Sequence, residues 1–487
     1  MDSPRVHKIG VHKIGGTSMS AVGTVVDDII LGRRPGAELY NRLFVVSAYS
    51  GITDLLLEHK KTGEAGVYAL YAGSENEGTW SEALAGTAAA MHEKNRAVLD
   101  DPSDVALADR FVEERIAGAS RCLLDLRRLC SFGHFKLPEH LMTVRELLSG
   151  IGEAHSAYNL MLRLRRAGVD AAFVDLTGWR GSESVTLDRR IAEALAPLDL
   201  SRQLPIVTGY AQCEEGLVRL YGRGYSEITF SRIAVHLGAA EAVIHKEFHL
   251  SSADPKVVGT AAVRPVTETN YDVADQLSGM GMEAIHPSAA KGLRQAGIPL
   301  CIKNTFDPDA PGATIRGDLQ AEAPAVELIT GLKRVYAFEF FEQDMVGVKG
   351  YDAAILEALK RHKTQVVAKT SNANTITHYL KGAAKAVKRV EQDLSERFPS
   401  ASITSRNVAV IAILGRDLRL PGLGARALTA LAEAGIEPLG FNDLLRKVDM
   451  QVIVDEEDHD ACIRALHRVL IEQPAGVAAG SSLSAAA

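Results

Sequence analysis

Short apolar segments of strand length alternate with helical segments through most of the chain, and this alternation limits the fold more than any other feature. The strand-like segments are residues 11–14, 42–47, 171–175, 204–208, 242–248 and 300–303. Strands that alternate with helices at this spacing are typical of a sheet covered by helices. We therefore predict an α/β fold for the first part of the chain.

One region departs from the alternation. Residues 60–149 are predicted to be mostly helical, and apolar residues recur at positions i, i+3 and i+4 within 106–129. The α/β unit is expected to end at the polar stretch 316–325, which contains Pro324 and has the composition of a linker.

Two shorter α/β units and a tail are predicted after this linker. Their strands and helices are expected at 333–341, 351–361 and 365–369, and at 408–414, 423–434, 449–454 and 458–471. The last residues, 474–487, are rich in Ala, Gly and Ser, and we expect them to be disordered.

The composition excludes several classes of protein. A chain of 487 residues, 46% hydrophobic and 24% charged, fits two or three ordinary globular domains. The net charge of −7 and the lack of a basic block argue against a nucleic-acid partner. The longest apolar runs are too short to cross a membrane, and the first residues lack the apolar region of a secretory signal. Five scattered cysteines without CxxC spacing indicate a reducing cytoplasm.

The first strand runs into a turn suited to phosphate binding. Lys13 stands near the end of the strand, Gly15 and Gly16 form the turn, and Thr17 and Ser18 could cap a following helix. Glycines let backbone N–H groups approach phosphate oxygens, and a lysine can neutralise charge on a transferred phosphoryl group. Taken alone, this pattern also fits a plain strand–helix turn, and it is neither a Walker A loop nor GxGxxG.

The pentapeptide VHKIG occurs twice in succession, at residues 6–10 and 11–15. Only the second copy continues into Gly-Thr-Ser. We therefore expect Lys13, and not Lys8, to be the functional lysine.

Further motifs follow in a defined order along the chain. They are Thr208-Gly209-Tyr210, Gly222-Arg223-Gly224-Tyr225-Ser226-Glu227, Ser251-Ser252-Ala253-Asp254-Pro255-Lys256, Ile285-His286-Pro287 and Lys303-Asn304-Thr305-Phe306. Together with the Lys13 turn, the series resembles the aspartate kinases of the amino-acid kinase superfamily over about the first 315 residues. The C-terminal part resembles two ACT domains.

This resemblance implies a fold and an assembly. Residues 1–320 would form the three-layer α/β/α sandwich of an amino-acid kinase catalytic domain. Two ACT-like, ferredoxin-type α+β domains would follow at 331–400 and 404–473, and a homo-oligomer would form through them.

The resemblance also implies the residues of the site. The phosphate loop would consist of Lys13, Gly15, Gly16, Thr17 and Ser18, and other nucleotide contacts would come from Gly222, Glu227, Lys246, Glu247, Asp254 and Lys256. L-Aspartate would be held by Ser47, Thr53, Glu153 and Arg223. Among these, Lys13, Glu153 and Arg223 would be catalytic, with Glu153 at a helix start. ATP and Mg²⁺ would be the cofactors, and no protein-bound metal is expected.

The chain departs from the family pattern on its nucleotide side. Tyr225 and Glu227 replace a glycine and an aspartate, and Glu247 replaces another aspartate. Lys256 stands in place of an arginine, and Glu283 in place of a lysine that contacts the nucleotide. With these substitutions, the chain resembles the subgroup of aspartate kinases that is associated with ectoine synthesis.

The implied reaction is attack of the aspartate side-chain carboxylate on the γ-phosphorus of ATP. A carboxylate is already ionised near neutral pH, so no general base is needed. Two alternatives stay open: another kinase of the superfamily, acting on a glutamate-type substrate, or an inactive regulator that senses ATP or amino acids.

His245 and His249 do not predict a metal site. They share the face of a predicted strand, where they would lie too far apart to chelate one ion.

The candidate effector loops are 343–350, 371–375 and 416–424, and the Ser-Ser-Glu effector signature typical of the family is absent. We therefore expect weak or altered feedback control.

Overall fold

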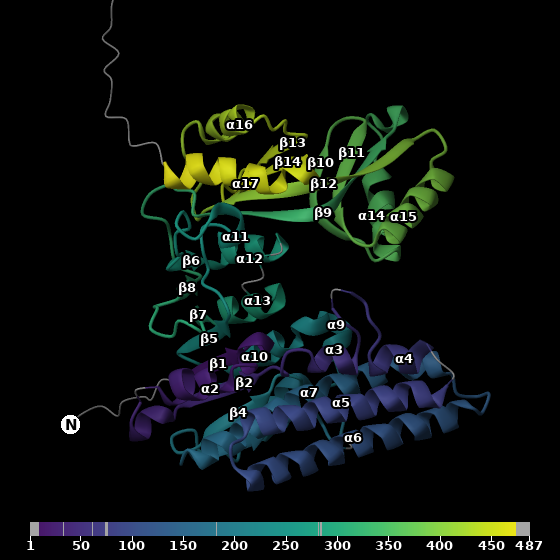
Figure 1. Cartoon of the computed structure of the whole chain (residues 1–487). Coiled ribbons are helices and arrows are strands. Elements are labelled where there is room, and N and C mark those ends of the chain that lie inside the picture. The colour runs from purple at the N-terminus through teal and green to yellow at the C-terminus, as the bar shows by residue number, and fades with distance from the viewer. Residues whose placement is uncertain are drawn as a thin grey trace, which may run out of the picture. The chain divides into compact units, whose positions relative to one another are not determined.

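The computed structural model describes residues 9–32, 34–60, 62–73, 76–181, 183–280, 282 and 285–473. The chain divides into two compact units (Figure 1). The first comprises Met1–His249 and Ile285–Gly317, and the second comprises Leu250–Ala284 and Asp318–Ala487. The predicted disordered tail and residues 6–8 of the first VHKIG copy lie outside the described residues. The predicted domain boundaries at 320, 331 and 404 stay a prediction.

The first unit contains the predicted parallel sheet. Its strands follow the order β3-β4-β2-β1-β5-β7-β8, and all neighbours run parallel except β7 and β8. Their bounds are β1 Gly10–Ile14, β2 Arg42–Val46, β3 Ala171–Val174, β4 Leu204–Thr208, β5 Glu241–Lys246, β7 Leu300–Asn304 and β8 Ala313–Arg316. The six predicted strands are confirmed, although β5 ends at Lys246 and not at Phe248.

The central strands are buried along their whole length and mostly apolar, because both faces of the sheet are covered. Every residue of β1, β2 and β4 is buried. Parallel strands that are buried on both faces are typically rich in apolar residues, as these strands are. Since β1, β2, β4, β5 and β7 are parallel, the loops after them all leave from the same edge of the sheet.

The helices of the first unit confirm the predicted helical region, and Figure 1 shows α5, α6 and α7 running alongside one another. The bounds are α1 Gly16–Met19, α2 Val22–Thr24, η1 Val25–Leu31, η2 Gly36–Leu39, α3 Ile52–Leu56, α4 Val67–Gly73, α5 Glu77–Val98, α6 Pro102–Cys130, α7 Leu137–Arg166, α8 Leu187–Leu195, α9 Leu217–Tyr221, η3 Gly222–Gly224, α10 Tyr225–His236 and α13 Pro287–Gln295. Local signals explain their starts. The Asp101 side chain, for example, accepts a hydrogen bond from Ser103 N before Pro102 opens α6.

Glu153 was expected at a helix start, and this prediction was wrong. The residue lies inside α7, which continues from Leu137 to Arg166. Two glycines let the helix pack closely. A Cβ on Gly150 would lie 2.9 Å from the Tyr210 ring, and one on Gly152 would lie 2.9 Å from Ala48 Cβ. Tertiary packing therefore overrides the weak helix propensity of glycine here.

The second unit is built on an antiparallel sheet with the order β10-β11-β9-β12-β14-β13. Its elements are α11 Pro255–Val258, β6 Glu268–Asn270, α12 Tyr271–Gly279, β9 Leu328–Phe341, η4 Gln343–Met345, α14 Tyr351–Arg361, β10 Gln365–Ser371, β11 Thr375–Lys381, α15 Ala384–Arg397, β12 Ser402–Leu414, α16 Leu423–Glu433, β13 Gly440–Asp443, β14 Asp449–Asp455, η5 Glu456–Asp458, α17 His459–His467 and η6 Arg468–Glu472.

Strands β9 and β12 are the longest strands of this sheet. They begin earlier than predicted, at Leu328 and Ser402, and they pair with each other from end to end. The pairing shifts register between Val408 and Val410, and near this point Arg334 adopts a positive φ of 58°. Two separate apolar cores lie along the sheet, one around Phe338 and Phe340 and one around Ile411 and Val452. The two predicted ACT-like units therefore share their longest strands.

Candidate active site

The glycine turn after β1 lies against the strands on both sides. Gly15 N donates a hydrogen bond to His245 O at 3.3 Å. A Cβ on Gly16 would lie 2.9 Å from Ala48 O, so a side chain at this position would force the backbone apart. Thr17 and Ser18 do not cap the helix, because both lie inside α1 and Gly15 is its N-cap. Ser18 is buried instead, and its hydroxyl accepts a hydrogen bond from Thr305 Oγ1 at 2.8 Å.

Lys13 and Lys246, both predicted site residues, contact the same oxygen of Glu227. Lys13 Nζ lies 3.7 Å from Glu227 Oε1, and Lys246 Nζ lies 3.9 Å from the same oxygen. Burial by itself would raise the pKa of Glu227, but the two lysines and a backbone hydrogen bond hold that pKa below its ordinary value. Glu227, whose side chain is 14% exposed, is thus a largely buried anion that two ammonium groups approach.

The other oxygen of Glu227 explains the position of the Ile-His-Pro motif. Glu227 Oε2 accepts a hydrogen bond from His286 N, at the start of α13. A Cβ on Gly224 would lie 2.5 Å from the His286 ring. The glycine of the Gly-Arg-Gly segment is therefore required where α10 and α13 meet.

A second polar group is centred on Glu153. Its Oε1 accepts a hydrogen bond from Ser226 Oγ at 2.8 Å, and Ser226 Oγ lies 3.4 Å from Ser47 Oγ. Glu153 is 2% exposed, and burial raises its pKa to about 8 against the opposing effects of the Ser226 hydroxyl and of Lys13. The influence of Lys13 on this pKa shows that the two polar groups are electrostatically connected.

Gly209 lets the residues of this group pack closely, because it has no side chain. A Cβ there would lie 2.7 Å from Ser226 Cβ and 2.9 Å from both Glu153 Oε2 and Val46 O. The Thr-Gly-Tyr motif after β4 therefore lets the Glu153 carboxyl, α10 and the sheet edge come into contact.

Arg223 is bound to the segment after β2. Its Nη1 donates to the Asp54 carboxylate, and its Nη2 donates to the Glu58 backbone oxygen. Thr53, the residue before Asp54, hydrogen-bonds the phenol of Tyr225. Tyr225 is 3% exposed, and burial, together with the negative charge of Glu153, raises its pKa.

The remaining predicted residues lie apart from these contacts. Gly222 adopts a positive φ of 56° as the first residue of η3, and Glu247 is exposed after β5. Asp254 and Lys256 belong to the second unit, where the Asp254 side chain caps α11 by accepting from Lys256 N at 2.8 Å. Glu283 lies outside the described residues.

Three further residues contact the predicted site residues and were not predicted from the sequence. Ser226 links Glu153 to Ser47, Tyr225 contacts Thr53, and Asp54 binds Arg223. The first two stand between Arg223 and Glu227 in a motif that the analysis had identified. Their proximity in sequence was the only signal. Asp54 could not be recognised, since its partner is far away along the chain.

The histidines near the site form two separate pairs. His245 Nε2 lies 3.1 Å from His12 Nδ1 inside the sheet, and His249 is hydrogen-bonded to Asp307. Within the described residues, no group of three or more His, Cys, Asp or Glu side chains could hold a metal ion.

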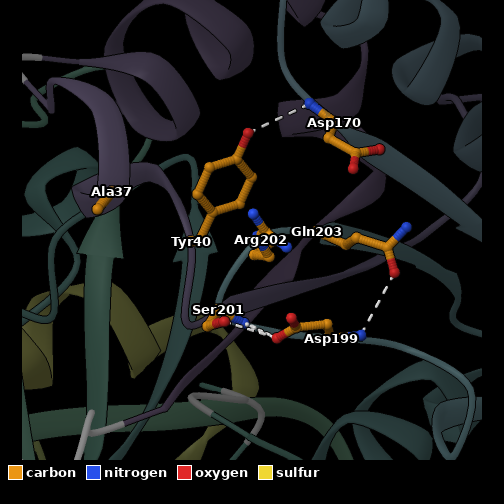
Figure 2. A pocket seen from close by; sticks show the side chains of 7 residues that line it. All are labelled: Ala37, Tyr40, Asp170, Asp199, Ser201, Arg202 and Gln203. Atoms are coloured by element: carbon orange, nitrogen blue, oxygen red, sulfur yellow. Dashed lines mark hydrogen bonds between the residues drawn. The ribbon is translucent and has the colours of Figure 1, made fainter.

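A hollow of about 650 Å³ lies at the opposite end of the strands, where β2, β3 and β4 begin (Figure 2). It is lined by residues that precede strands, among them Tyr40, Asp170 and Gln203, and Asp170 N donates to Tyr40 Oη at 3.4 Å. Because the site described above is built from loops that follow the strands, this hollow is separate from it.

Among the described helices, none is long and apolar enough to span a membrane.

Comparison with known proteins gives a consistent result. The profile of the amino acid kinase family matches residues 8–304. "Aspartate kinase Ask_Ect" from Stutzerimonas stutzeri is 51% identical over 462 residues, which is 95% of this chain and 97% of that protein. Crystal structures of E. coli aspartokinase III, one with aspartate and ADP and one with lysine and aspartate, share the fold with a TM-score of 0.71. Each is 21% identical, and each alignment covers 95% of this chain and at least 99% of that structure.

Proposed function

This chain belongs to the aspartate kinases of the amino acid kinase family, and we propose that it transfers the γ-phosphoryl group of ATP to the side-chain carboxylate of L-aspartate. The observation that carries this proposal is the contact of Lys13 and Lys246 with the largely buried Glu227, beside the Glu153–Ser226–Ser47 group. The first group supplies positive charge for a phosphate chain, and the second supplies polar contacts for a small zwitterionic acceptor. The binding of aspartate and ADP by the E. coli relative supports this division of roles.

The transfer needs positioning and charge neutralisation more than covalent help from the protein. An oxygen of the aspartate β-carboxylate forms a bond to the γ-phosphorus, and the bond from that phosphorus to the β,γ-bridging oxygen breaks. The products are 4-phospho-L-aspartate and ADP. Lys13 would stabilise the charge that spreads over the transferred group.

The acceptor would be held by the second group of residues. Arg223 can bind a carboxylate through its guanidinium, and Glu153, when ionised, can accept from the substrate ammonium. The hydroxyls of Ser47 and Thr53 would complete the contacts. Roughly seven or more kcal/mol of the barrier can be removed by such alignment in favourable cases.

Mg²⁺ would enter as part of the MgATP substrate. Magnesium in kinases is bound largely by phosphate oxygens and water, with few protein ligands.

Trapping of the product tests the proposal. The protein is incubated with MgATP, an amino acid and hydroxylamine, which converts acyl phosphates to hydroxamates. We expect hydroxamate with L-aspartate and none with L-glutamate. Product with glutamate alone would indicate another kinase of the family, and no product with any amino acid would indicate an inactive regulator.

Two further proposals concern the assembly of the enzyme and its cellular location. We propose a homo-oligomer formed through the second unit, supported by the exposed edge strand β10 at one side of its sheet. Light scattering of the purified chain would test this.

The described cysteines are all free thiols, which fits a cytoplasmic enzyme.

The pathway assignment rests on the relative named Ask_Ect. We propose that the enzyme serves ectoine synthesis and is weakly inhibited by lysine and threonine. Activity measured with saturating lysine or threonine would test the regulatory part. Strong inhibition by either amino acid would contradict it.

A further inference from the structure

We propose that Asp54 is a positioning residue that holds Arg223 ready for the substrate carboxylate, an inference that rests on the function proposed above. Asp54 lies in α3 after β2, and Arg223 lies in η3 before α10. Their contact joins the two segments that carry most of the proposed aspartate-binding residues.

Two points of attachment fix the plane of the Arg223 guanidinium. Nη1 donates to Asp54 Oδ1, and Nη2 donates to the Glu58 backbone oxygen. A guanidinium has five N–H groups in a rigid fork, so two bonds define its orientation and leave other donors for a ligand. The side chain is 21% exposed, and it is therefore accessible to a small molecule.

Arg223 needs this support because its own backbone segment is short. Gly222 and Gly224 flank it, Gly222 has a positive φ of 56°, and η3 has only three residues. Arginine has many rotamers, and nothing in such a segment would select one of them. A partner on another element is thus required for a defined geometry.

Asp54 is itself well fixed. Its Oδ1 also accepts a hydrogen bond from Lys60 N at 3.2 Å, and its Oδ2 lies 3.9 Å from His59 Nε2. Glu58, whose backbone oxygen binds Arg223, is held through its side chain by Arg145, with Arg145 Nη1 at 2.8 Å from Oε2. Two arginines and two carboxylates thereby form a chain of ion pairs behind the proposed substrate site.

The Asp54–Arg223 ion pair allows one other interpretation, which predicts the opposite effect of an Asp54 substitution on aspartate binding. If Asp54 occupied the place of the substrate carboxylate, its removal would free Arg223 and strengthen aspartate binding. The fixation of Asp54 by Lys60 N favours positioning, because a carboxylate that must move away would be expected to have fewer bonds of its own.

Steady-state kinetics of Asp54→Asn in the full-length protein test the proposal. We expect the KM for L-aspartate to rise about tenfold or more, in line with the loss of a charge-assisted hydrogen bond, while the KM for MgATP changes less than about twofold. Asp54→Glu should recover part of the aspartate affinity, because it restores the carboxylate.

Asp188→Asn is the matched control. It removes an exposed Asp–Arg pair, with Arg232, from α8 of the same unit and should leave both KM values unchanged. An unchanged or lower KM for aspartate in Asp54→Asn would overturn the inference. So would equal rises in both KM values in Asp54→Asn and Asp54→Glu, which would indicate general damage to the fold. Failure of the proposed function is distinguishable, since then the unaltered protein would form no aspartyl hydroxamate.

Discussion

The Lys13 ammonium lies 3.7 Å from Glu227 Oε1, and this contact defines the charge of the proposed nucleotide side of the site. Lys246 approaches the same oxygen at 3.9 Å, so two cations share one largely buried anion. The group keeps a net positive charge, as binding of a polyphosphate requires. Glu227 holds both lysines in place without cancelling their combined charge.

Removal of the Lys13 ammonium should affect the chemical step. We expect Lys13→Ala to lower kcat by about 10²- to 10³-fold, the range seen when one group that stabilises transition-state charge is lost. Hydroxamate formation under saturating substrates would measure it. Lys8→Ala, in the first copy of the repeat, serves as the control and should stay active. A normal kcat in Lys13→Ala would remove this lysine from the mechanism.

The raised pKa of Glu153 predicts pH-dependent aspartate binding. Its pKa of about 8 means that the carboxyl is largely protonated near neutral pH, whereas the substrate ammonium needs the ionised form. Binding must therefore release a proton below pH 8, and the KM for aspartate should fall about tenfold per pH unit as pH rises toward 8.

Glu153→Gln should weaken binding and abolish this dependence. Calorimetry in buffers of different ionisation enthalpy would count the protons released. Glu193→Gln, an exposed glutamate on α8, should behave like the unaltered protein. A pH-independent KM in the unaltered enzyme would contradict the assigned role of Glu153.

The close packing at Gly209 predicts a specific intolerance. Gly209→Ala would place a methyl group 2.7 Å from Ser226 Cβ and 2.9 Å from Glu153 Oε2. We expect a loss of about 1–3 kcal/mol in the free energy of unfolding, as for other overpacked sites, with a sharp fall in activity. Gly23→Ala has no atom within 4 Å of the added carbon and should be tolerated. Urea denaturation of both variants would show the contrast.

The buried histidines predict a loss of stability in acid. Burial lowers the pKa of His155 and of His245 to about 3, and it also lowers the pKa of His12. A histidine whose pKa is depressed by folding contributes stability above its unfolded pKa of about 6.5, and this contribution is lost as pH falls toward 3. Each such residue should reduce the free energy of unfolding by about 1.4 kcal/mol per pH unit in that range.

Denaturant unfolding between pH 7 and pH 4.5 would measure this slope. His245→Asn should make it shallower, whereas His249→Asn, at a more exposed position, should leave it unchanged. Equal slopes for His245→Asn and the unaltered protein would show that the His12–His245 pair does not titrate as proposed.

Local sequence determined the elements of this protein and the order of its motifs. The strand, glycine turn and helix at Lys13 follow from residues adjacent in sequence, as do the helices from α4 to α7. The motif order also identified the family that the comparisons confirm. These properties depend on hydrophobic periodicity and backbone preference, which act over a few residues.

Only the tertiary structure decided which charges meet. Lys13 was predicted to act on phosphate, but its contact with Glu227 depends on α10 packing beside β1. Glu153 was assigned to a helix start, and packing against Ala48 and Tyr210 places it inside a long helix instead. Asp54 carried no local signal, because an ion pair between distant segments leaves no periodic trace in either of them. The sequence thus determined the groups available for phosphoryl transfer, while the fold determined their partners, their burial and their pKa values.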